Sequence, residues 1–233
     1  HQLEVLLNSH NSGINSSINS SDRKKLIPKR AILPYFLRVK DQNTKLWRSW
    51  NVTPELEARF IQSVRMKPRR TASGVATITV ITRPHTCSSN CIYCPCDLRM
   101  PKSYIANEPA CQRAELAFFD PYIQVAARLQ ALHQMGHSTD KIELIVLGGT
   151  WSDYPASYQY WFIRELFRAL NEWPHSPQHI EKRTDWYRSF GLQNTEEALS
   201  SFVAYRQTTI NAGAATYNQA FHELYDSSQA HQK

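Results

Sequence analysis

Four of the five cysteines of this chain lie within ten residues, in the order Cys87-Ser-Ser-Asn-Cys91-Ile-Tyr-Cys94-Pro-Cys96. The first three have the spacing C-x3-C-x2-C. A loop of this kind can place three thiolates at three corners of a cubane iron–sulfur cluster, which leaves the fourth iron open to a substrate or cofactor. The sequence therefore predicts that Cys87, Cys91 and Cys94 ligate a 4Fe-4S cluster. Cys96 and Cys111 are expected to be free thiols.

A zinc site is the alternative that the same residues leave open. Cys87, Cys91 and Cys94, with either Cys96 or His85 as the fourth ligand, form a set that zinc accepts. Zinc sites normally join two ligand pairs across a longer loop, and Cys94-Pro-Cys96 is tight for two bonds to one ion, so the spacing favours the cluster. His85 is expected to be a structural, hydrogen-bonding residue.

Positive charge is concentrated in one part of the chain. Residues 23–70 contain fourteen Lys and Arg residues against three acidic ones, a net charge of +11, whereas the residues after 70 have a net charge of −2. This asymmetry suits a polyanion, because each neutralised phosphate releases counterions and aromatic side chains among the charges can stack on bases. The simpler alternative is a solvated basic face with its aromatic residues in the core. The residues expected to bind RNA are Lys24, Lys25, Lys29, Arg30, Arg65, Lys67, Arg69 and Arg70, and the candidate stacking residues are Tyr35, Phe36, Trp47 and Trp50.

Two predicted strands position the cysteine loop and a glycine pair. Residues 75–82 are β-branched almost throughout and run directly into the cysteine loop, and residues 141–147 form a second strand that ends at Gly148-Gly149-Thr150. Between them, Asp120-Pro121 opens a helix that closes at Gly136. The order strand, helix, strand implies a right-handed crossover and a parallel pair, so the fold class is α/β, with functional loops at the carboxyl ends of the strands.

Other segments carry helix and linker signals. Thr53-Pro54-Glu55 has a capping hydroxyl, a proline and an acid, which predicts a helix to about Val64. Residues 158–173 and 195–206 are also expected to be helical. Residues 8–22 are rich in Asn and Ser and indicate a linker or disordered tail. The expected organisation is a tail over 1–22, a basic and mainly helical extension over 23–74, and an α/β domain over 75–233.

Length and composition exclude several classes of protein. The chain has 233 residues, only five cysteines, and no apolar run of the roughly 18 to 20 residues that a membrane span needs. It fits one domain with a small extension rather than a disulfide scaffold or a membrane protein. We see no secretory signal after His1, so a reducing, cytoplasmic setting is expected.

The cysteine motif, with Tyr93 before its last cysteine, resembles the signature of radical S-adenosylmethionine enzymes. In that superfamily the methionyl amine and carboxylate of the cofactor bind the open iron, and reduction of the cluster cleaves the sulfonium to a 5'-deoxyadenosyl radical. A Gly-Gly-acid segment after the second strand contacts the cofactor there. The resemblance implies that Gly148, Gly149 and Thr150, which replaces the acid, bind S-adenosylmethionine.

A longer series of motifs resembles one family within this superfamily. The motifs occupy residues 70–75, 83–87, 91–95, 102–104, 108–109, 113–114, 120–122, 136–138, 140–143 and 148–150. In this order they are similar to the catalytic subunit of Elongator and its bacterial and archaeal homologues, from about Lys25 to Leu170.

The family joins a radical S-adenosylmethionine domain, a TIM-like barrel that is incomplete in this chain, to a lysine-acetyltransferase-like domain. The resemblance implies an acyltransferase that modifies C5 of the wobble uridine of tRNA with a group derived from acetyl-CoA. It also implies that the basic extension binds tRNA, and Lys141 matches a lysine that the family assigns to acetyl-CoA. The partners it implies are tRNA and either a homo-oligomer or an Elongator-like assembly, with no membrane.

Two features depart from the family. Cys96-Asp97 stands where members usually have Gly-Gly, and the first two cysteines are closer together than in eukaryotic members; the cluster is expected to tolerate both changes. The chain also ends before a convincing third strand and without a Gly-rich acetyl-CoA loop. We therefore expect a truncated gene product or an excised fragment. The alternative function is that of a non-catalytic, tRNA-binding remnant.

Overall fold

The computed structural model describes residues 28–89 and 91–226. The predicted tail over 1–22, with Lys24 and Lys25, lies outside these residues. The described residues divide into two compact units, one made of residues 28–76 and 131–141, and the other of residues 77–89, 91–130 and 142–226. No helix in the described ranges is both long and apolar enough to cross a membrane.

The basic part of the first unit is helical, as predicted. It contains α2 (Lys29–Gln42), α3 (Thr44–Ser49), α4 (Pro54–Val64) and the 3-10 turn η1 (Pro68–Thr71). Helix α4 has the predicted bounds because the Thr53 hydroxyl accepts a hydrogen bond from the amide of Leu56 at 3.2 Å and so caps its first turn.

An aromatic core holds the three helices of the first unit together. Leu33, Phe36, Phe60 and Val64 are buried, and the rings of Phe36 and Phe60 lie 4.5 Å apart. Phe36 is only 2% exposed, so the prediction that it offers a stacking surface for bases is wrong: its ring fills the core instead. Tyr35 remains half exposed.

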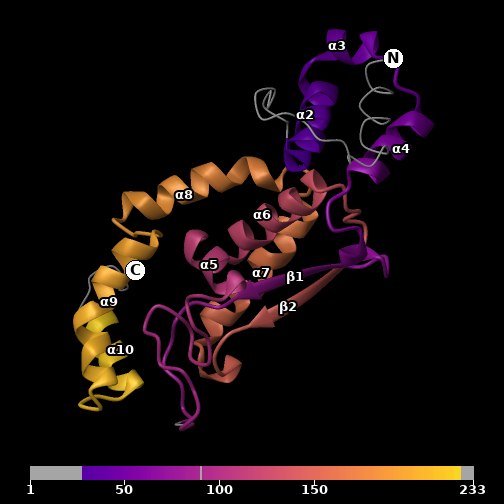
Figure 1. The fold of residues 1–233 in the computed structure, drawn as a ribbon. Helices are drawn as coiled ribbons and strands as arrows, with labels where there is room; N and C mark the ends of the chain where they lie inside the picture. Colours follow the sequence, from indigo (N-terminus) through magenta and orange to yellow (C-terminus); the bar gives the residue numbers. More distant parts are fainter. Residues whose placement is uncertain (1–27, 90, 227–233) are drawn as a thin grey trace, which may run out of the picture. The chain divides into compact units, whose positions relative to one another are not determined.

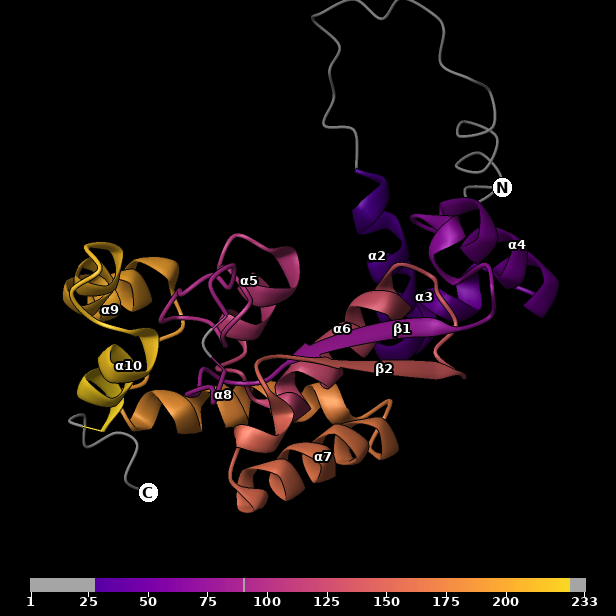
Figure 2. The ribbon, with the colours of Figure 1, turned by 90° about the horizontal axis from the view of Figure 1, so that it is seen from below.

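Strands β1 (Ala76–Ile81) and β2 (Ile142–Leu147) form the predicted parallel pair. The amide of Ala76 donates to the carbonyl of Lys141, and the amide of Thr82 donates to the carbonyl of Leu147, each at 2.9 Å. Both strands therefore advance in the same direction, as their arrowheads show in Figure 1, and the turned view of Figure 2 shows them side by side. The cysteine loop and the Gly148-Gly149 segment follow the carboxyl ends of these neighbouring strands, and the α/β class is confirmed.

Helices account for most of the remaining second unit (Figure 1). The predicted helix after Asp120 is α6 (Pro121–Gln134), and those predicted over 158–173 and 195–206 are α7 (Ala156–Asn171) and α9 (Glu196–Asn211). Three further helices, α5 (Pro109–Leu116), α8 (Ile180–Ser189) and α10 (Tyr217–Tyr225), were not predicted. The unit also contains the 3-10 turns η2 (Trp151–Asp153) and η3 (Ser176–His179).

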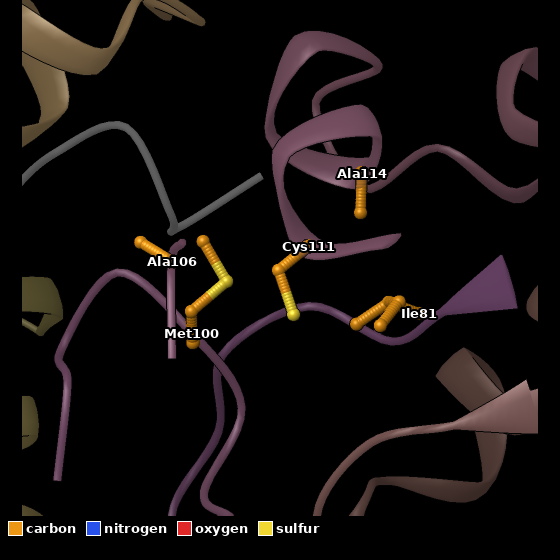
Figure 3. Packing of buried hydrophobic residues seen from close by; sticks show 5 residues of the cluster. All are labelled: Ile81, Met100, Ala106, Cys111 and Ala114. Carbon is orange, nitrogen blue, oxygen red and sulfur yellow. The ribbon is translucent and has the colours of Figure 1, made fainter. Parts of the chain in front are cut away.

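A small apolar cluster anchors the cysteine loop beside β1 and α5. Ile81, Met100, Ala106, Cys111 and Ala114 pack together in it, and the Cys111 side chain points into the cluster (Figure 3). Burial raises the pKa of the Cys111 thiol to about 11, so the thiol stays protonated and behaves as a small apolar side chain. Cys111 is a free thiol, as predicted.

A buried ionic cluster holds α8 in place. Arg183 of α8 pairs with Asp120 at 3.1 Å and with Glu165 of α7, and both carboxylates are almost fully buried. The guanidinium also lies 4.0 Å from the ring centroid of Tyr122, and the hydroxyl of Tyr187 donates to Asp120 at 2.8 Å. Arg183 therefore bridges two carboxylates that are shielded from water, and Glu165 also pairs with Arg164 at 3.2 Å and Arg168 at 3.8 Å.

Candidate functional site

The loops that follow β1 and β2 enclose a pocket of about 230 Å³. The three predicted cluster cysteines line it together with all three residues of the Gly148-Gly149-Thr150 segment, and Ser89, Lys102 and Ser103 complete its walls. The fold thus brings together two motifs that are more than fifty residues apart in the sequence, because each follows the carboxyl end of one strand of the parallel pair.

Cys87 is the most enclosed of the three cysteines, with 8% of its surface exposed. Its Sγ lies 3.3 Å from the hydroxyl oxygen of Thr150. Asn218 on α10 fixes its backbone from both sides: the amide of Cys87 donates to Oδ1 at 3.1 Å, and its carbonyl accepts from Nδ2 at 2.7 Å. No sequence pattern marks Asn218, because it is a single asparagine 131 residues away.

Two tyrosines hold the segment that connects β1 to Cys87. The Tyr154 hydroxyl donates to the carbonyl of Arg83 at 2.7 Å and lies 2.8 Å from the hydroxyl of Thr82. The Tyr158 hydroxyl accepts from the amide of Arg83 at 3.0 Å. Both tyrosines are buried, so these hydrogen bonds are shielded from water and fix the exit of the chain from β1.

His85 has the structural role that its sequence context predicted. Its Nε2 hydrogen-bonds to the backbone carbonyl of Asp153 at 3.0 Å, and its ring stacks on Tyr154 with centroids 4.8 Å apart. Burial lowers the pKa of His85 below its ordinary value. Asp153 in turn accepts from the amide of Ser88 at 2.6 Å, and this hydrogen bond lowers the pKa of the Asp153 carboxyl.

Cys91 and Cys94 occupy the outer side of the loop. Cys91 is exposed, and its carbonyl accepts a hydrogen bond from the amide of Cys94 at 3.2 Å, which closes a turn. The Cys94 Sγ lies 3.2 Å from the hydroxyl oxygen of Ser103. Ser103 has a φ of +82°, a left-handed conformation that a residue with a Cβ adopts at a cost.

The first glycine of the Gly148-Gly149 pair is required for steric reasons. A Cβ on Gly148 would lie 1.8 Å from the Thr82 hydroxyl oxygen, which no side chain can tolerate. A Cβ on Gly149 would meet its nearest atoms, in Lys102 and Tyr154, at 3.8 and 3.9 Å, which is ordinary contact. Gly148 therefore allows the chain to leave β2 directly against the end of β1.

Lys102 is the cation of the pocket. It is 5% exposed, its ammonium donates to the carbonyl of Ser89 at 3.5 Å, and the ammonium lies 5.6 Å from the ring centroid of Tyr217. No acidic residue in the described ranges forms an ion pair with it. Burying an ammonium without a carboxylate partner costs free energy unless an anion binds beside it. The sequence contains Lys102 in a family motif but does not show its burial.

The three cysteines line a common space and do not meet at one point. Within residues 28–89 and 91–226, no three His, Cys, Asp or Glu side chains converge closely enough to hold one metal ion. A cubane takes each thiolate on a different iron, so its ligands lie apart around a shared space, and the three cysteines here line one pocket. Cys96, whose thiol donates to the carbonyl of Cys94 at 3.4 Å, and His85 do not line it.

The other predicted binding residues lie away from this pocket in the chain. Lys141 is exposed and precedes β2, so the six residues of that strand separate it from Gly148. Of the predicted RNA-binding residues that the structure describes, Arg65 is half-buried and the rest are exposed; they are Lys29, Arg30, Lys67, Arg69 and Arg70.

Comparison with known proteins gives relatives for about half of the chain. It is 44% identical over 126 residues to a tRNA uridine(34) acetyltransferase of Methanocaldococcus infernus, and 46% identical over 105 residues to one of Dehalococcoides mccartyi. It is 39% identical over 131 residues to human Elongator complex protein 3. No family model matches the chain.

These matches cover 52%, 45% and 52% of this chain but only 24%, 23% and 24% of the respective relatives. The chain thus spans about a quarter of the length of the curated relatives that it matches. The two names that these relatives carry, tRNA uridine(34) acetyltransferase and Elongator complex protein 3, agree with the family that the series of sequence motifs predicted. Over about half of its own length, this chain is similar to members of the Elongator catalytic subunit family.

Proposed function

We propose that this chain is part of a tRNA-modifying radical S-adenosylmethionine enzyme of the Elongator catalytic type. The observation that carries the proposal is the shared pocket, in which Cys87, Cys91 and Cys94 face the Gly148-Gly149-Thr150 segment. Two motifs that the same family resemblance assigns to one cofactor site thus line one cavity. Their position at the carboxyl ends of parallel strands is where α/β folds place their ligand sites.

In this proposal, the three cysteines hold a 4Fe-4S cluster and the Gly-Gly-Thr segment holds S-adenosylmethionine. When bound, these groups supply one-electron cleavage of the sulfonium and the resulting carbon radical. Gly148 and Gly149 have no side chains of their own, so a ligand in the pocket can approach their backbone closely. The Lys102 ammonium supplies positive charge beside the three cysteine thiolates and the carboxylate of the bound S-adenosylmethionine. This charge lowers the electrostatic cost of bringing these anions together.

The two-stranded sheet is, in this proposal, the beginning of a TIM-like barrel. In the described part of the chain, β2 pairs with β1 alone. A second hollow, of about 420 Å³, lies along β2 and shares Gly148 and Gly149 with the pocket. Val146, Leu147 and Ile163 give it apolar walls, which further strands of a longer protein would cover.

The substrates follow from the relatives, of which three are named tRNA uridine(34) acetyltransferase. We infer that the complete protein acts on C5 of the wobble uridine with a group derived from acetyl-CoA. The exposed cations at the start of α2 and around η1 supply tRNA affinity, since each phosphate contact releases counterions. Lys141, which is exposed, is the candidate contact to the phosphates of acetyl-CoA.

Anaerobic reconstitution tests the proposal. The purified chain should bind about four irons and four sulfides per chain. Cys91→Ser should lose most of them, because Cys91 lines the pocket, whereas Cys96→Ser should keep them, because Cys96 does not. A chain that takes up no iron but binds tRNA in a salt-dependent way would contradict the proposal and support the non-catalytic, tRNA-binding alternative.

A further inference from the structure

A threonine and a serine hydroxyl lie beside the sulfurs of Cys87 and Cys94 in the pocket. Thr150 Oγ1 lies 3.3 Å from Cys87 Sγ, and Ser103 Oγ lies 3.2 Å from Cys94 Sγ. Both separations are hydrogen-bonding distances for sulfur. The two hydroxyls come from different loops, Ser103 from the one after β1 and Thr150 from the one after β2, and both line the pocket. The same contact therefore arises twice, independently.

The backbone of Ser103 supports a role for its side chain. Its φ of +82° is disfavoured for any residue with a Cβ, and such conformations persist only where the surroundings hold them. The Tyr104 amide closes this turn by donating to the carbonyl of Pro101 at 3.2 Å, and the neighbouring side chain of Lys102 is buried. In this conformation the Ser103 hydroxyl reaches the Cys94 sulfur.

We propose that Ser103 and Thr150 donate hydrogen bonds to the Cys94 and Cys87 thiolates of the bound cluster and thereby raise its reduction potential. This inference rests on the proposed function, since it needs the cluster. A thiol can donate or accept, but a sulfur bound to iron has lost its proton and can only accept, so the hydroxyl becomes the donor.

The direction of the effect follows from charge. Reduction adds one electron to the cluster, supplied by an external one-electron reductant, and makes and breaks no covalent bond. The reduced cluster is more negative by one charge, so its sulfurs accept hydrogen bonds more strongly than those of the oxidised cluster. Donated hydrogen bonds therefore stabilise the reduced form and raise the potential, as hydrogen bonds to cluster sulfurs generally do. Ser103 and Thr150 are thus positioning residues that act through the ligand cysteines.

A reductive titration of the reconstituted 233-residue chain tests this, with dithionite as the reductant and no S-adenosylmethionine present. Ser103→Ala and Thr150→Val should each lower the midpoint potential by about 59 mV, a tenfold change in the ratio of reduced to oxidised cluster. Thr150→Ser keeps the hydroxyl and should keep the potential. Ser89→Ala is the matched control, because Ser89 lines the same pocket and its hydroxyl has no cysteine sulfur as a partner within the described residues.

Two results would overturn the inference. One is normal iron and sulfide content with an unchanged potential in both Ser103→Ala and Thr150→Val. The other is an equal fall of the midpoint potential in the control variants Ser89→Ala and Thr150→Ser, which would show that the effect comes from changed packing. If Ser103→Ala loses the cluster, Ser103→Gly removes the same hydroxyl without placing a Cβ at positive φ and replaces it in the titration. A wild-type chain that binds no cluster would instead refute the proposed function itself.

Discussion

The exit from β2 makes a sharp prediction for Gly148→Ala. The new Cβ would lie 1.8 Å from the hydroxyl oxygen of Thr82, and Thr82 is only 1% exposed, so it has no free space to move into. The hydroxyl of Thr82 also lies 2.8 Å from that of Tyr154, which holds the carbonyl of Arg83. Relief of the clash therefore disturbs the hydrogen bonds that fix the start of the cysteine loop.

The size of the effect combines overpacking with a lost hydrogen bond. Overpacking of a well-packed site costs about 1–3 kcal/mol, and the Thr82–Tyr154 hydrogen bond contributes about 1 kcal/mol, so unfolding should become easier by about 2–4 kcal/mol. Urea unfolding of the purified chain, followed by circular dichroism, measures this as a lower midpoint at an unchanged slope.

Gly149→Ala is the matched control for this prediction. Its Cβ would meet its nearest neighbours at 3.8 Å and beyond, so its unfolding free energy should stay within about 0.5 kcal/mol of wild type. Equal destabilisation by the two substitutions would refute the steric reasoning, and so would a Gly148→Ala variant with the wild-type midpoint.

Three further predictions concern residues that support the site. Asn218→Ala should leave the amide and carbonyl of Cys87 without their side-chain partner. We therefore expect a lower iron content after reconstitution and a faster loss of iron on dilution. Gln219→Ala, on the same helix, should behave as wild type. Arg183→Met should lower the unfolding free energy in urea by about 3–5 kcal/mol, because it leaves the buried carboxylate of Asp120 without its ion pair, whereas Glu165 keeps Arg164 and Arg168 nearby. A loss below about 1 kcal/mol would contradict the buried ionic cluster. Burial raises the pKa of Glu115 to about 7 from 4.5, so folding favours the protonated carboxyl. The unfolding free energy should therefore fall by about 3 kcal/mol as pH rises from about 4.5 to 7. Glu115→Gln should remove this part of the pH dependence.

Local sequence patterns predicted the elements that position the pocket. Helix α4 begins at Pro54 because Thr53 caps it, and β1 is β-branched through most of its length; both depend on neighbouring residues. The meeting of Cys87 with Gly148 was also predictable, since loops after adjacent parallel strands lie at the same edge of a sheet. These features need no knowledge of contacts between distant residues.

Residues whose roles depend on tertiary contacts were not predictable. Helix α8 has no buried side chain and a polar sequence, and it is held by the ion pairs of Arg183. The hydrogen bonds of Asn218 to Cys87 join residues on α10 and in the cysteine loop. Burial of Phe36 and Lys102 likewise arises from packing, which a one-dimensional pattern of charge and aromatic residues does not show.

The most direct test of the central claim is reductive cleavage of S-adenosylmethionine by the reconstituted chain under anaerobic conditions. With dithionite as the electron source, wild type and Cys96→Ser should both release 5'-deoxyadenosine and methionine, and Cys87→Ser should release neither, because only Cys87 of these two cysteines lines the pocket. Cleavage that is unaffected by Cys87→Ser, or a fully iron-loaded wild-type chain that yields no 5'-deoxyadenosine, would contradict a radical S-adenosylmethionine site at the carboxyl ends of β1 and β2.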